Sequence, residues 1–159
     1  MERDLMQEIK KEDILLEFIY SPIKNRQNMI SPIQIMKGMF LLGKEMNLQN
    51  FYEFKPYLYG PCSFEIYSDL SKLENKGLID SIPTPKGWNY YIITEKGKEI
   101  ARELEKRLDK DLIEKILQIK EIVLSKGFLE LLEFVYTKYP KYAVNSIINM
   151  EGFKKWPSS

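Results

Sequence analysis

Residues 51–94 read FYEFKPYLYGPCSFEIYSDLSKLENKGLIDSIPTPKGWNYYIIT, and this stretch decides the fold. An aromatic segment ends in the YGP step at 59–61. A helical pattern then runs until Gly77, and glycine is the usual left-handed residue after a helix. Two strand-like segments follow, near 78–83 and 88–94, and the PKG turn at 85–87 separates them. The stretch therefore predicts one helix followed by a two-stranded hairpin.

The residues before this helix predict two more helices and an irregular aromatic segment. An apolar stripe indicates a helix over 12–20, and Ser31-Pro32 is a helix start that leads to an end near Glu45. Residues 46–61 are predicted to be extended with partial strand character, because Pro56 limits strand pairing. In the third helix a three-residue spacing predicts an inward-facing stripe of Phe64, Tyr67, Leu70 and Leu73.

The residues after the hairpin are predicted to be helical. Apolar residues recur every three or four positions from Lys98 to Leu124, with a break expected near 109–111. Two shorter helices are predicted over 128–139 and 142–149. A long amphipathic helix cannot bury its apolar stripe alone. It therefore either joins two copies of the chain or covers the core of its own.

Three helices followed by a hairpin is the order of a winged helix-turn-helix, in which the hairpin is the wing. We therefore predict an α+β fold with a winged-helix domain at 1–97 and a C-terminal helical extension at 98–159. Of the two uses of the extension, dimerisation is favoured, because the apolar stripe is long for so small a domain. DNA-binding proteins of this kind are commonly two-fold dimers, so the predicted partners are double-stranded DNA and a second copy of the chain.

Two family resemblances support the fold. The segments LSKLENKGLI and YYIITEKGKEI, at about 70–100, resemble the end of winged-helix regulators of the PadR and MarR types. The YGP step, Tyr67 and the C-terminal FVYTKYPKYAVNSI resemble YwgA-like proteins and the related Panacea antitoxin-type domains, over roughly residues 12–148. These resemblances imply a winged-helix core with helical additions, either regulatory or antitoxin-like. They carry over no catalytic residue.

The composition argues against most enzyme classes. The 159 residues include no histidine and one cysteine, so histidine-based triads and multi-ligand zinc sites are excluded, and no glycine-rich phosphate loop is present. We therefore expect a protein that is not an enzyme and that uses no metal or cofactor. The single cysteine, and the lack of an apolar run near the roughly 20 residues of a membrane helix, predict a cytoplasmic protein that does not enter a membrane.

The third helix carries the candidate DNA-reading residues. Lysine contacts guanine or phosphate and asparagine contacts adenine, so four side chains on its exposed face are candidates: Ser68, Lys72, Asn75 and Lys76. Acidic residues share this helix: Glu65, Asp69 and Glu74. Carboxylates are repelled by phosphates, so the alternative is a solvated helix face.

The predicted wing adds three candidates. Lys86 is placed to meet phosphate, and Trp88 and Asn89 to flank the minor groove. The alternative for Trp88 is packing across the hairpin onto the core.

A second hypothesis makes the winged helix a scaffold for protein binding without DNA. The net charge is +1, and basic and acidic residues are nearly equal in number over 1–94, which argues against a DNA-binding face. The aromatic segment would then dock a protein partner, either a toxin or a regulator, through Tyr57 and Tyr59. Cys62 is either structural or a reactive thiol whose pKa is lowered at a helix start.

Overall fold

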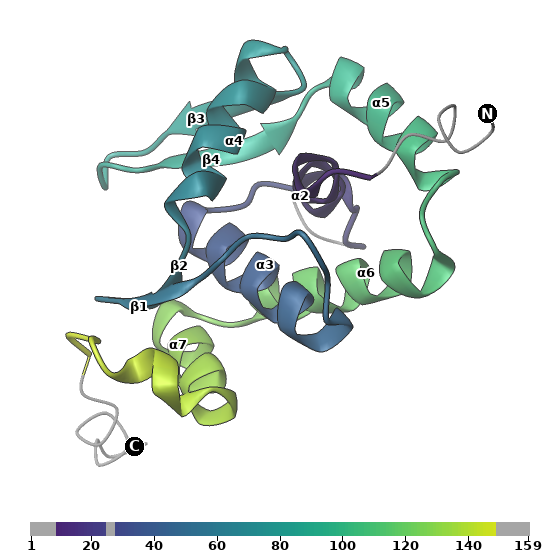
Figure 1. Ribbon diagram of the computed structural model, residues 1–159. Helices are drawn as coiled ribbons and strands as arrows, with labels where there is room; N and C mark the ends of the chain where they lie inside the picture. The colour runs from purple at the N-terminus through teal and green to yellow at the C-terminus, as the bar shows by residue number, and fades with distance from the viewer. Residues whose placement is uncertain (1–8, 25–27, 149–159) are drawn as a thin grey trace.

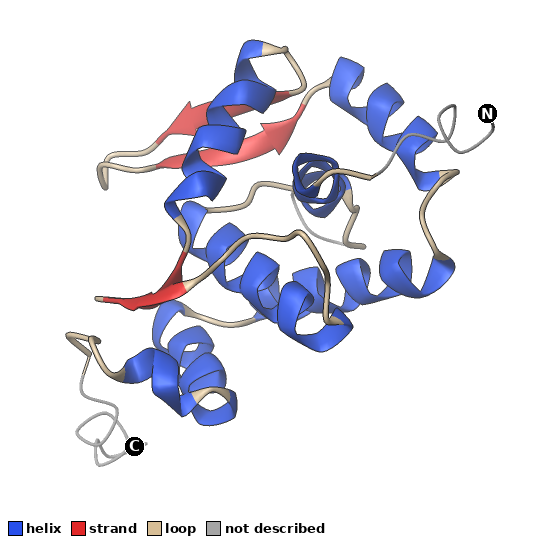
Figure 2. Ribbon diagram, viewed as in Figure 1, coloured by secondary structure: helices blue, strands red, loops and turns tan. Residues whose placement is uncertain are grey.

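The computed structural model describes residues 9–24 and 28–148 (Figure 1). It confirms a mixed α+β protein in which helices pack beside two small antiparallel hairpins (Figure 2). In chain order the elements are α2 (Lys11–Tyr20), α3 (Pro32–Met46), β1 (Lys55–Tyr57), β2 (Gly60–Cys62), α4 (Phe64–Asn75), β3 (Ile79–Pro83), β4 (Asn89–Ile93), α5 (Glu95–Glu105), α6 (Lys110–Ser125), α7 (Phe128–Lys138) and the 3₁₀ turn η1 (Pro140–Ala143).

Local capping signals begin and end the helices where the sequence predicts. The Ser31 hydroxyl accepts a hydrogen bond from the Gln34 N–H at 3.2 Å, and the Gln34 side chain accepts one from the Ser31 N–H at 2.9 Å. At the end of α4, Gly77 has a φ of 77°. This left-handed conformation lets the Leu78 N–H reach the Leu73 carbonyl at 3.0 Å. The chain thereby turns directly from α4 into β3.

The second hairpin matches its prediction and gains one extra pairing. β3 and β4 pair from Ile79 opposite Ile93 to Pro83 opposite Asn89. Ile30, just before α3, forms an isolated bridge with Tyr91, with backbone hydrogen bonds of 3.0 and 2.8 Å. The bridge ties the entry to α3 to the hairpin that follows α4.

The first hairpin, β1–β2, confirms the extended segment with partial strand character, although its short strands pair across Pro56 itself. Pro56 lies opposite Pro61, between the pairs Lys55–Cys62 and Tyr57–Gly60. Pairs of an antiparallel ladder alternate between hydrogen-bonded and non-bonded. The two prolines share a non-bonded position, so neither is required to donate an N–H. Two prolines in register are therefore compatible with a hairpin.

The C-terminal helices pack onto the N-terminal ones and share a single core with them. The long predicted helix is divided into α5 and α6, with Asp109 as the N-cap of α6, so the expected break is confirmed. α5 lies against α2, and α6 lies against α3. Most of the apolar stripe that suggested dimerisation is buried within the chain, namely Leu104, Leu112, Ile116, Ile119 and Val123.

The predicted last helix over 142–149 is wrong within the described residues. The chain forms η1 and then an irregular turn, and position 149 lies outside the described residues. Side chains of this turn form hydrogen bonds with backbone groups in place of regular helical bonds. The Ser146 hydroxyl accepts from the Ile148 N–H at 3.0 Å, and the Asn145 amide donates to the Pro56 carbonyl at 3.0 Å.

Lys120 of α6 is a buried charge that joins three segments. Its ammonium is fully buried and donates to the Ile19 carbonyl (2.7 Å), the Ser21 carbonyl (2.6 Å) and the Asn28 side-chain oxygen (2.5 Å). Burial lowers the pKa of Lys120 to about 7. The three oxygen acceptors and the negative end of α2 favour the ammonium form. The bonds fix α6 to the end of α2 and to the segment that leads into α3.

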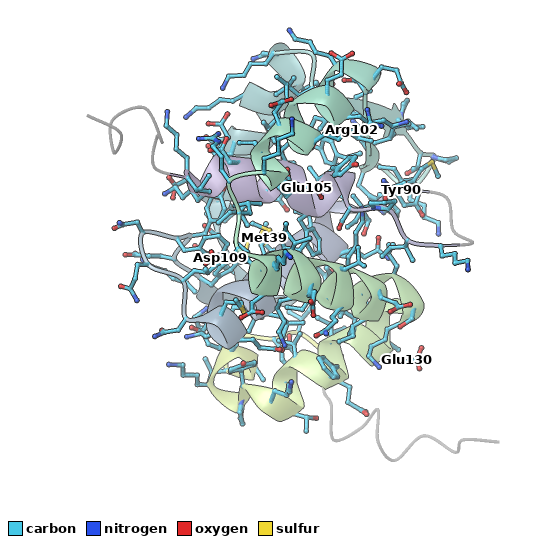
Figure 3. The ribbon with its side chains drawn as sticks, turned by 90° about the vertical axis from the view of Figure 1, so that its right-hand side faces the viewer. Met39, Tyr90, Arg102, Glu105, Asp109 and Glu130 are labelled. Carbon is cyan, nitrogen blue, oxygen red and sulfur yellow. The ribbon has the colours of Figure 1, made fainter. Side chains whose placement is uncertain are left out.

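Glu17 of α2 is a buried acid that faces another acid. Its side chain is 2% exposed and its Oε2 has no hydrogen-bond partner among the described residues; the neighbouring acid is Glu105 of α5, labelled in Figure 3 where α5 passes α2. Burial, followed by the repulsion of Glu105, raises the pKa of Glu17 to about 8. Glu17 is therefore largely protonated in the folded protein at neutral pH.

We expect Lys120→Met to lower the free energy of unfolding by about 2–5 kcal/mol, because three buried oxygens lose their donor. The matched control is Lys115→Met on the same helix. Lys115 pairs with Glu45 at 3.4 Å near the surface, and its loss should cost less than about 1 kcal/mol. Urea unfolding at pH 7 measures both values. If both substitutions lower the free energy of unfolding equally, the buried Lys120 hydrogen bonds stabilise the fold no more than a surface ion pair does.

Glu17→Gln should remove a dependence of stability on pH. The folded-state pKa is raised, so the stabilising contribution of protonated Glu17 is complete below its ordinary pKa of 4.5 and is lost as pH rises toward about 8. The wild type should therefore lose a few kcal/mol relative to the variant between pH 5 and 8, since each pKa unit corresponds to about 1.4 kcal/mol. The measurement is urea unfolding of both proteins at several pH values. The lowered pKa of Lys120 gives a pH dependence of opposite sign, but it is the same in both proteins and cancels in the difference. If the free energy of unfolding depends on pH in the same way in both proteins, the pKa of Glu17 is not raised.

Candidate functional site

A groove with a volume of about 800 Å³ opens between the two hairpins. In Figure 1 both hairpins project toward the same side of the molecule, at the left of the view. The first turn of α3, the start of α4 and the segment that leads into α7 complete the walls. We call it the aromatic groove, because seven aromatic side chains line it: Tyr57, Tyr59, Phe64, Tyr67, Trp88, Tyr90 and Phe128.

The aromatic side chains support one another at the rim of the groove. The ring of Phe64 lies edge-on to Tyr57, with centroids 4.9 Å apart, and Tyr59 contacts Phe128 in the same way at 5.6 Å. Despite these contacts, 60% of Phe64 remains exposed, as does 53% of Leu58 at the hairpin tip. Neighbouring exposed apolar side chains are a feature of surfaces that bind a partner.

The C-terminal part of the chain holds the β1–β2 hairpin in place beside the groove. The Ile147 N–H donates to the Leu58 carbonyl at 3.0 Å. Gly60 has a φ of 90°, and a Cβ atom there would lie 2.9 Å from the Tyr136 ring. Glycine is therefore needed at 60 both for its conformation and for the close approach of α7. The YGP step shapes the groove, as expected of a turn.

All the charged side chains that line the groove are lysines: Lys37, Lys86 and Lys126. Among the described residues, no aspartate or glutamate lines it. Lys37 of α3 is 3% exposed, and its ammonium donates to the Pro61 carbonyl at 3.0 Å. Burial lowers the pKa of Lys37 to about 8, so the ammonium form still predominates at pH 7.

Cys62 lies beside Lys37 and is half-buried. Burial raises the pKa of its thiol, and the opposing effect of Lys37 is smaller. Of the two alternatives for Cys62, the raised pKa favours the structural one over a reactive thiol.

The α4 stripe differs from its prediction. Phe64 and Tyr67 are exposed at the groove, whereas Ile66, Leu70 and Leu73 are buried. Asp69, expected on the outer face, is also buried and accepts a hydrogen bond from the Tyr52 hydroxyl at 2.5 Å. A buried tyrosine donor gives this carboxylate a partner inside the core.

The four predicted reading residues of α4 (Ser68, Lys72, Asn75 and Lys76) lie exposed on that helix and do not line the groove. Both lysines already have acidic neighbours. Lys72 lies 3.6 Å from Asp69, and Lys76 pairs with Glu12 of α2 at 2.9 Å. Glu65 also has a partner, because Lys11 of α2 pairs with it. The outer face of α4 thus carries little uncompensated positive charge.

The predicted wing residues separate into two groups. Lys86 and Trp88 line the groove, while Asn89 is exposed at the start of β4. Trp88 is half-buried and contacts Tyr90 of β4 with ring centroids 4.8 Å apart, so its ring packs along its own strand and not across the hairpin onto the core. Lys86 and Trp88, predicted to contact DNA, therefore line the same groove as Tyr57 and Tyr59, which were predicted to contact a protein partner.

Sequence reasoning did not assign several residues of the groove to a site, among them Lys37, Lys126 and Phe128. One signal was available for Lys37, which interrupts the otherwise apolar run IMKGMFLL at 35–42. A charged residue inside an apolar helix is rarely buried without a reason. Lys126 and Phe128 reach the groove only through tertiary packing.

Comparison with protein-family models and with curated proteins gives no match. Within residues 9–24 and 28–148, no group of three or more His, Cys, Asp or Glu side chains could hold a metal ion. In the same part of the chain, no helix is long and apolar enough to cross a membrane. Two surfaces of the described chain bear on the predicted functions: the aromatic groove and the outer face of α4.

Proposed function

We propose that the protein is a partner-binding module whose aromatic groove docks an apolar segment of another protein. The observation that carries this proposal is the open groove with its exposed aromatic rim. Tyrosine, tryptophan and phenylalanine are enriched at the centres of protein interfaces, where a few such side chains supply most of the binding energy. A small-molecule pocket encloses most of its ligand, whereas this rim extends outward along the β1–β2 hairpin and α4.

The resemblance to antitoxin-type domains is in line with this proposal, because an antitoxin acts by contacting its toxin. Two features of α4 also favour partner binding over DNA reading. Residues 47–63, between α3 and α4, contain a whole hairpin, whereas a helix-turn-helix has a turn of three to four residues. The first turn of α4, which should meet the bases, carries the exposed Phe64 beside Tyr57.

DNA binding by a winged helix is the second candidate function. It is supported by the order of α2, α3, α4 and the β3–β4 hairpin, with Ile30 bridging to Tyr91 as a short third strand. Exposed Ser68, Lys72 and Asn75 supply donors on the outer face of α4. Homodimerisation accompanies this candidate as a prediction.

A display library of random 12-residue peptides tests the first proposal. Peptides selected on the wild-type protein should lose at least tenfold in affinity with Phe64→Ala or Tyr59→Ala, because truncating an aromatic anchor typically costs about 2 kcal/mol or more. Phe64 is 60% exposed and Tyr59 43% exposed, so truncating either should leave the fold intact. Ser68→Ala, on the outer face of the same helix, is the matched control. If no peptide is selected, or if the selected peptides bind all three variants equally, the groove is not a docking site.

Fluorescence anisotropy with random-sequence duplex DNA over a salt series tests the second candidate. If Lys72 contacts phosphate, Lys72→Ala should weaken binding and reduce the slope of log K against log salt by about one unit. Lys106→Ala, at the end of α5, is the control and should leave the slope unchanged. Absence of salt-dependent binding would remove DNA as a partner.

A further inference from the structure

Lys37 is a buried ammonium that the described part of the protein leaves incompletely satisfied. An ammonium has three N–H donors. The Pro61 carbonyl accepts one of them, and among the described residues no carboxylate lies within 4.0 Å to neutralise the charge. Lys120, equally buried on α6, has three oxygen acceptors. The two buried lysines therefore differ in how completely the protein itself satisfies them.

The cost of this arrangement argues for a role at Lys37. Burying a charge without a counterion is expensive, and a methionine or leucine of similar size would fill the same space in α3 without that cost. Lys37 is one of the residues that line the aromatic groove, which places this incompletely satisfied side chain at the wall of an open site. A carboxylate in the groove would complete the hydrogen bonds of the ammonium and neutralise it.

The rest of the groove fits an acidic segment. Lys86 and Lys126 add positive charge at other points of the wall, and no described lining residue opposes them. The aromatic rim suits apolar side chains on either side of the acid. One deeply buried lysine among apolar walls matches a carboxylate better than a phosphate, whose three strong acceptor oxygens call for more donors.

We propose that the segment docked in the aromatic groove carries an aspartate or glutamate, flanked by apolar side chains, whose carboxylate pairs with Lys37. This inference rests on the partner-binding function proposed above and names the chemistry of the partner. Lys37 sets specificity for the acid, and the aromatic rim supplies apolar contact area that does not depend on it.

The test uses peptides selected from the same random 12-residue library on the full chain at pH 7. The selected sequences should share an acidic residue between apolar ones. A fluorescein-labelled selected peptide should bind the wild type at least tenfold more tightly than its counterpart with Asp→Asn or Glu→Gln. Against Lys37→Met the two peptides should bind within about twofold of each other, because the carboxylate has lost its partner.

Three controls make the result specific to Lys37. Lys37→Arg keeps the charge and should retain a preference for the acidic peptide. Lys72→Met, outside the groove, should retain the full tenfold difference. The comparison of the two peptides on the wild-type protein needs no substitution, so it stands even if Lys37→Met fails to fold.

The outcomes separate the two proposals. Selected peptides that lack an acid, or that bind equally well when neutralised, would overturn the role of Lys37 and leave the docking function standing. An acidic preference that persists in Lys37→Met would also overturn it, since Lys86 or Lys126 would then be the reader. Failure to select any peptide would overturn the docking function, and this inference with it.

Discussion

The hydrogen bonds of the Lys120 ammonium are the interaction on which the rest of the architecture depends. They join the end of α2, Ser21 and Asn28 to α6, which is far from them in the sequence. α6 in turn lies along α3 and leads directly into α7. α7 places Tyr136 against Gly60 of the first hairpin. One buried charge therefore helps to set the position of a hairpin that it never touches, and with it one wall of the aromatic groove.

The features that the sequence predicts well are the ones governed by neighbouring residues. Ser31 and Gly77 act on backbone groups within five residues of themselves, so their roles can be read without a structure. The β3–β4 hairpin belongs to the same class, because its turn chemistry and strand pattern are local. These signals establish the order of helices and strands around α4 and the α+β class.

The features that were missed depend on register, helical phase or distant contacts. Pro56 is tolerated because Pro61 lies opposite it in a non-bonded pair, which no single position reveals. In α4, a strict three-residue repeat drifts round the helix, because each residue turns about 100°. Phe64 and Leu73 therefore lie on opposite sides, and the buried stripe follows the spacing of Ile66, Leu70 and Leu73.

The aromatic groove could not be predicted as a unit, because five separate segments form it. Tyr57 and Tyr59 were singled out for one function and Lys86 and Trp88 for another, and only the packing of both hairpins on one side brings them together. The same packing explains the weak charge of α4. Glu12 and Lys11 of α2 pair with Lys76 and Glu65, so charges that look free in the sequence are compensated by a helix more than 50 residues earlier.

The two buried lysines show why burial alone does not identify a site. Lys120 and Lys37 are both buried, and burial lowers the pKa of each. Lys120 is enclosed by three oxygen acceptors, which is sufficient reason for a lysine to be buried there. Lys37 borders an open groove and has one such acceptor, so its desolvation cost is only partly offset within the described chain.

A lysine that the protein desolvates but does not neutralise gains more from an incoming counterion than a solvated lysine does, because the cost of removing it from water has already been met. Specificity for an acid thus follows from the unmatched burial of Lys37 more than from the number of lysines around the groove.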